Sequence, residues 1–129
     1  LKHSDLFCAA ASLSGALAMR GRFDSGDEDW HREMRLVFGD SIADSEDIPT
    51  LIERADRSTM PALWIDCGTE DFLLDQNRRV HEQLNNLGIA HHYSEHPGAH
   101  TWDYWDARIQ EALEFLCGAM GRGNAKDLV

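Results

Sequence analysis

The sequence lacks the features that mark several large classes of protein. It has no long uncharged apolar run, and its first residues contain no apolar signal-peptide core, so neither a membrane span nor a secretion signal is predicted. Basic residues are scarce: 12 Lys and Arg stand against 23 Asp and Glu, which gives a net charge of −11. We expect no nucleic-acid partner, because the chain offers no basic surface to neutralise phosphates.

Cysteine is also sparse. The three cysteines, Cys8, Cys67 and Cys117, lie far apart, and no two have the spacing CxxC. This pattern supports neither a zinc knuckle nor a disulfide framework. Free thiols are typical of a reducing cytoplasm, which is the location we expect. Each cysteine fits a small buried hydrophobe; Cys67, at the end of a predicted strand, keeps a catalytic role as a minor alternative.

An initiator methionine is absent as well, so we expect the sequence to be a piece of a longer protein. Its 129 residues make at most one domain. The hydrophobic fraction of 43% and the charged fraction of 27% are ordinary for a globular chain.

What the sequence does contain is an alternation of short apolar runs and helical patterns. Three runs are predicted as buried parallel strands, at residues 9–13, 62–67 and 89–95. Between the last two, Val80, Leu84 and Leu87 have helical spacing, and Gly88 ends the helix. The alternation predicts an α/β fold with three parallel strands and flanking helices. So small a sheet leaves an unpaired edge, through which homo-oligomers could form.

Two further regions lie outside this alternation. Residues 18–58 form a long excursion with predicted helices at 30–38 and 48–55. The excursion fits equally well a cap over the carboxyl edge of the sheet and a plain crossover helix with a decorated loop. A terminal helix is predicted for 105–119, followed by a flexible tail at 121–129.

The candidate catalytic residues are Asp71 and His100. Each lies in the loop after a predicted strand, Asp71 in GTED and His100 in PGAH, and ligands of open α/β sheets bind at that edge. Histidine is the best general base near neutral pH, and a carboxylate can fix its tautomer. The neighbouring Glu70 is expected to point to solvent. As residue types alone the pair is weak evidence, because Asp and His also serve in turns.

The sequence segments around these residues resemble those of a known group of enzymes. The segments are HSDLFCAAASLSGA at 3–16, GTEDFL at 68–73 and PGAHTWDYW at 97–105. They are similar to α/β-hydrolase esterases of the tributyrin esterase and S-formylglutathione hydrolase (esterase D-like) group. The resemblance implies the C-terminal part of an α/β-hydrolase fold, with Asp71 as triad acid and His100 as triad base. It also implies a serine carboxylic-ester hydrolase that forms an acyl-enzyme from a small ester or thioester and needs no cofactor.

One departure from that group is decisive. The Gly-x-Ser-x-Gly nucleophile motif is absent, and Ser12 and Ser14 do not fit it. We therefore expect the nucleophile upstream, so that residues 1–129 are a partial hydrolase domain that is inactive alone. The alternative is a non-catalytic fragment or binding module that keeps the hydrolase fold.

Two other interpretations of the site residues are weaker. His92, His96 and His100 are four apart, as zinc ligands on a helix would be, but Pro97 and Gly98 break such a helix, so no metal site is expected. A second set is aromatic and could line an acyl pocket, although core packing is the commoner role: Trp102, Tyr104 and Trp105.

Overall fold

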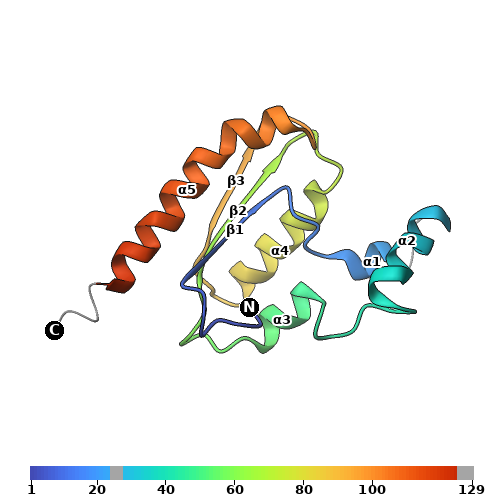
Figure 1. Ribbon diagram of the computed structural model, residues 1–129, viewed down its shortest axis with the longest axis horizontal. Helices are drawn as coiled ribbons and strands as arrows, with labels where there is room; N and C mark the ends of the chain where they lie inside the picture. Colours follow the sequence, from blue (N-terminus) through green and yellow to red (C-terminus); the bar gives the residue numbers. More distant parts are fainter. Residues whose placement is uncertain (24–27, 125–129) are drawn as a thin grey trace.

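The computed structural model describes residues 1–23 and 28–124. Its centre is a parallel sheet of β1 (Ala9–Leu13), β2 (Ala62–Gly68) and β3 (His92–His96), in the order β1-β2-β3. The register pairs Ala11 with Trp64 and Asp66 with Ser94. In Figure 1 the sheet lies between α5 (Trp102–Asn124) on one face and α4 (Leu74–Asn86) on the other. The expected α/β architecture of three parallel strands with flanking helices is confirmed.

The two faces of β2 differ in character because side chains alternate along a strand. On the α4 face, Ile65 joins a core with Val80 and Leu84, which α3 (Ile48–Arg54) completes through Ile52. On the α5 face, Trp64 and Asp66 are both buried. The sheet therefore has an apolar face and a face that includes a buried carboxylate.

Helix α4 ends with a complete glycine cap. Gly88 has φ of +65°, its N–H donates to Asn85 O at 3.0 Å, and Ile89 N–H donates to Leu84 O at 2.9 Å. This is the Schellman arrangement that satisfies the last carbonyls of a helix. The cap also corrects one boundary: Ile89 closes α4 and packs in the core, so β3 starts at His92 and not at residue 89.

The excursion after β1 contains α1 (Met19–Phe23), α2 (Glu28–Phe38) and α3. Helix α3 packs on α4, where Gln83 Nε2 donates to Pro49 O at 2.9 Å. The α1–α2 part extends to the side of the sheet in Figure 1. It reaches the loop after β2 through Arg22, whose guanidinium lies 5.3 Å from the Phe72 ring centroid. Whether this part acts as a cap stays a prediction.

Helix α5 is longer than the sequence pattern predicts. It begins at Trp102 and continues to Asn124, so the first four residues of the expected tail, 121–124, are helical. The remaining part, 125–129, lies outside the described residues. Within the described ranges, no helix combines the length and the apolar character needed to cross a membrane.

Candidate active site

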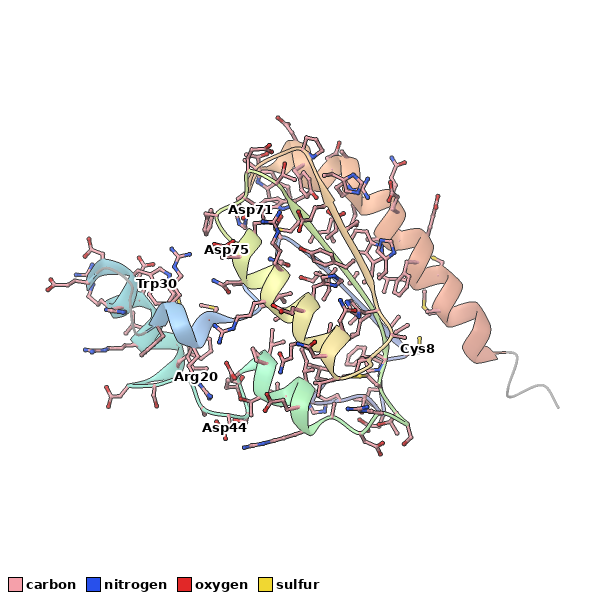
Figure 2. All side chains as sticks on the ribbon, turned by 180° about the vertical axis from the view of Figure 1, so that it is seen from behind. Cys8, Arg20, Trp30, Asp44, Asp71 and Asp75 are labelled. Carbon is pink, nitrogen blue, oxygen red and sulfur yellow. The ribbon has the colours of Figure 1, made fainter. Side chains whose placement is uncertain are left out.

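The candidate acid and base meet at the carboxyl edge of the sheet. His100 Nδ1 and Asp71 Oδ2 are 2.9 Å apart, although the two residues are 29 positions apart in the sequence. Figure 2 shows Asp71 at the end of the molecule where α4 begins, above Asp75 and far from Cys8. The structure thus brings together the pair that the sequence analysis singled out.

Asp71 is held by the turn that starts α4. Its side chain is fully buried, its Oδ1 accepts the N–H of Leu73 at 2.8 Å, and its carbonyl accepts the N–H of Leu74 at 3.1 Å. Asp and Asn favour this local turn because the side chain mimics a backbone acceptor. With Oδ1 occupied by Leu73, Oδ2 is the oxygen aimed at His100.

One ring nitrogen of His100 is engaged in a hydrogen bond, and the ring lies between two aromatic neighbours. A carboxylate oxygen can only accept, so Nδ1 carries the proton and Nε2 keeps its lone pair in the neutral imidazole. The ring lies between Phe72, at a centroid distance of 4.7 Å, and Trp105, at 4.8 Å and perpendicular. Its side chain is 31% exposed. This arrangement suits a general base that receives a proton from a nucleophile at Nε2.

The thiol nearest this site is not poised as a nucleophile. Cys67 is completely buried. Burial, and next the charge of Asp71, raise the pKa of the Cys67 thiol to about 11, so the thiol stays protonated near neutral pH. The alternative catalytic role of Cys67 is therefore disfavoured.

A buried polar cluster that the sequence analysis missed lies behind the site. The fully buried carboxylate of Asp66 accepts hydrogen bonds from Tyr104 Oη at 2.5 Å, Ser94 Oγ at 2.7 Å and Arg108 Nε at 3.2 Å. Burial, followed by the Asp66 hydrogen bond, raises the pKa of Tyr104 above its usual range. A carboxylate in the middle of a buried strand was the signal, because such a group needs partners.

The aromatic residues after His100 have three different fates. Tyr104 packs in the core, Trp105 contacts His100, and Trp102 is 80% exposed. A separate hollow of about 250 Å³ lies beside Phe72, where the loop after β2 meets α1 and α2. It is lined by Ala16, Met19, Arg22, Trp30, Phe72, Leu73 and Gln76.

The three histidines with four-residue spacing also separate. His92 stacks on Trp64, His96 Nε2 lies 3.6 Å from Asp66 Oδ2, and His100 bonds to Asp71. Among the described residues, no group of three or more His, Cys, Asp or Glu side chains is placed to hold a metal ion.

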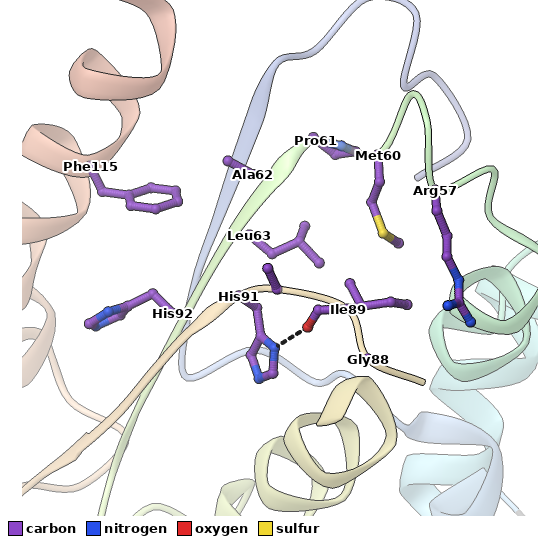
Figure 3. A pocket seen from close by; sticks show the side chains of 11 residues that line it. Arg57, Met60, Pro61, Ala62, Leu63, Gly88, Ile89, His91, His92 and Phe115 are labelled. Carbon is purple, nitrogen blue, oxygen red and sulfur yellow. Dashed lines mark hydrogen bonds between the residues drawn. The ribbon is translucent and has the colours of Figure 1, made fainter. Parts of the chain in front are cut away.

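A larger hollow, of about 540 Å³, lies at the opposite end of the sheet (Figure 3). It surrounds the amino ends of β2 and β3, where His91 Nδ1 donates to Ile89 O at 2.8 Å. Neither Asp71 nor His100 lines it. The candidate catalytic pair and this hollow are therefore at different ends of the fold.

Comparison with known proteins adds the family. A family described as "Putative esterase" matches residues 1–116. The chain belongs to this esterase family. An acetyl esterase of Caldicellulosiruptor saccharolyticus is 31% identical over 127 residues, which cover 90% of this chain and 47% of that protein. The chain therefore spans about half the length of this curated esterase.

Solved esterase structures give the same fold. S-formylglutathione hydrolase FrmB of Staphylococcus aureus is 26% identical, with a TM-score of 0.71 over 89% of this chain and 48% of that one. A ferulic acid esterase matches with a TM-score of 0.72 at 24% identity, over 92% of this chain and 44% of that one. The α/β-hydrolase fold and the esterase group expected from the sequence are confirmed.

Proposed function

We propose that the intact protein is a serine carboxylic-ester hydrolase in which Asp71 and His100 complete a catalytic triad. The observation that carries the proposal is the 2.9 Å hydrogen bond between His100 Nδ1 and the buried Asp71 Oδ2. It supplies the base and the orienting carboxylate that activate a hydroxyl nucleophile. The family match supports the reaction class. The serine itself lies outside residues 1–129 in this proposal.

In the proposed mechanism, the serine hydroxyl attacks the ester carbonyl carbon while His100 Nε2 takes its proton. The tetrahedral intermediate collapses, the bond to the leaving oxygen or sulfur breaks, and His100 returns the proton to that leaving group. Water then attacks the acyl-enzyme, giving its proton to Nε2, and the serine leaves with that proton. Asp71 stabilises the imidazolium in both halves. No step needs a metal ion or an organic cofactor.

The proposed substrate is a small ester or thioester. The related proteins include an acetyl esterase and an S-formylglutathione hydrolase, so short acyl groups are the class to test first. A tributyrin esterase-like preference is part of the same proposal. The free thiols Cys8 and Cys117, together with the buried Cys67, fit a cytoplasmic enzyme.

The test is turnover of p-nitrophenyl acetate by the intact protein. His100→Ala is expected to lower kcat by several powers of ten, because the serine loses its base. His3→Ala, an exposed histidine near the start of the chain, is the matched control and should keep full activity. Near-normal turnover in His100→Ala would reject the assignment, and an intact protein with no turnover at all would support the alternative of a binding module.

A further inference from the structure

The loop after β2 carries Asp71 and is called the acid loop; the loop after β3 carries His100 and is called the base loop. The two loops are joined by backbone hydrogen bonds that do not involve Asp71 or His100. Thr69 N–H donates to His96 O at 2.9 Å, and Glu70 N–H donates to Gly98 O at 3.0 Å. These bonds continue the contact of β2 with β3 past the end of the sheet. The two loops therefore stay side by side beyond the last ladder pair.

The side chain of Glu70 adds a second connection to the same residue. Its Oε2 accepts the N–H of Gly98, and its Oε1 accepts the hydroxyl of Thr69 at 2.8 Å. Glu70 thus binds both the N–H and the carbonyl of Gly98. The expectation that Glu70 only points to solvent is wrong in this respect: the residue is exposed, yet its carboxylate binds the neighbouring loop.

Gly98 is confined on its other sides as well. Its φ of +145° is a conformation that residues with a side chain rarely adopt. A Cβ at Gly98 would lie 2.4 Å from the Tyr104 ring, and a Cβ at Gly68 would lie 2.1 Å from Gly98 O. The base loop is therefore packed between Gly68 and Tyr104, and Glu70 binds the backbone of this loop at Gly98, which lies close to Gly68.

The position of this contact gives it a consequence for catalysis. Glu70 immediately precedes Asp71, and Gly98 is two residues before His100. Fixing Glu70 to Gly98 therefore fixes the backbones that carry the acid and the base. Among the described residues, the partly exposed His100 ring is held by its hydrogen bond to Asp71 and by contacts with the rings of Phe72 and Trp105. The Gly98 hydrogen bond, and then that of Thr69, lower the pKa of Glu70, so the carboxylate is ionised at neutral pH.

We propose that Glu70 is a positioning residue for the catalytic base. Its carboxylate binds the N–H of Gly98 in the base loop, so that His100 stays within hydrogen-bond reach of Asp71. This inference rests on the proposed esterase function. A displacement of about 1 Å in a catalytic group can cost about 100-fold in rate, so the loss of the hydrogen bond between Glu70 and Gly98 is expected to lower kcat measurably.

The experiment compares Glu70→Ala and Glu70→Gln in the intact enzyme with p-nitrophenyl acetate. Glu70→Ala removes the acceptor and is expected to lower kcat by about 10- to 100-fold with KM changed less than about twofold. Glu70→Gln keeps an oxygen that can accept the Gly98 N–H, so it is expected to stay within about threefold of the parent. Glu82→Ala, an exposed glutamate on α4, is the matched control and should be unchanged.

A proton NMR measurement separates positioning from general damage to the fold. The Nδ1 proton of His100, bonded to Asp71, should give a downfield resonance in the parent and in Glu70→Gln. In Glu70→Ala that resonance should broaden because the bond opens to water more often. The proposal is overturned if Glu70→Ala keeps kcat within twofold, or if Glu70→Gln is as slow as Glu70→Ala. Activity that survives His100→Ala would instead overturn the proposed function itself.

Discussion

Replacing Asp71 with asparagine should place the His100 proton on the wrong nitrogen. Asp71 Oδ1 accepts the N–H of Leu73 at 2.8 Å, so an asparagine at this position must direct its carbonyl oxygen to Leu73. Its amide group then faces His100 Nδ1, where the carboxylate oxygen lies 2.9 Å away in the parent. An amide donates, so Nδ1 has to accept, and the proton moves to Nε2. The nitrogen that should take the proton of the serine is then already protonated.

The expected cost is large. The same tautomer change in the serine-protease triad, a worked case of the general mechanism, lowers kcat by about 10⁴. At about 1.4 kcal/mol per factor of ten, this is a loss of about 5.5 kcal/mol of transition-state stabilisation. The hydrogen bond to Leu73 is retained, so the thermal unfolding midpoint of Asp71→Asn should stay close to that of the parent.

The assay is kcat for p-nitrophenyl acetate with the intact enzyme, with thermal unfolding measured on the same samples. Asp75→Asn, the same chemical change at an exposed position on α4, is the matched control and should keep parental turnover. The reasoning would be refuted if a folded Asp71→Asn enzyme kept more than about a tenth of the parental kcat.

Three further predictions concern thiol reactivity, acid stability and association. Iodoacetamide at pH 8 should modify the exposed Cys8 and Cys117 but not the buried Cys67, whose thiol pKa is raised to about 11. A third alkylated cysteine in the folded protein, detected by mass spectrometry, would contradict this. Hydrogen bonding by Arg78 is the main cause that lowers the pKa of Glu95 from 4.5 to about 2, so this pair stabilises the fold above about pH 4.5 and less as the pH falls toward 2. Denaturant titrations should show a shallower loss of stability across this pH range in Arg78→Gln than in the parent, and equal slopes would contradict the assignment. The 129-residue chain made alone should hydrolyse no ester and should self-associate through β1, an edge strand of the sheet among the described residues. Sedimentation as a monomer with a sharp thermal transition would contradict the second part.

Much of the fold could be predicted because its signals are local. The apolar run of β2 lies between Pro61 and Gly68, and the spacing of Val80 and Leu84 identifies the buried face of α4. Gly88 ends α4 through its positive φ, as expected for a glycine cap. The start of β3 was predicted too early, since periodicity does not distinguish an apolar residue that closes a helix from one that begins a strand.

The candidate pair could be located because parallel strands deliver their following loops to one edge. That rule places Asp71 beside His100 without knowledge of any side-chain contact. The supporting contacts could not be predicted in the same way. Asp66 meets Tyr104 only through the packing of α5, and Glu70 meets Gly98 only through the register of the two loops. Such partners are far apart in the sequence, and no regular spacing of residues marks the contact between them.

The central claim is that Asp71 and His100 serve a serine that lies outside these 129 residues. A fluorophosphonate reacts preferentially with a serine that a general base activates, so it reports the nucleophile directly. The measurement is to label the intact protein and its His100→Ala variant and to locate the adduct by peptide mass spectrometry. One adduct is expected, on a serine upstream of Leu1, and it should be lost in His100→Ala. An adduct on Ser12 or Ser14, or labelling that persists without His100, would contradict the account.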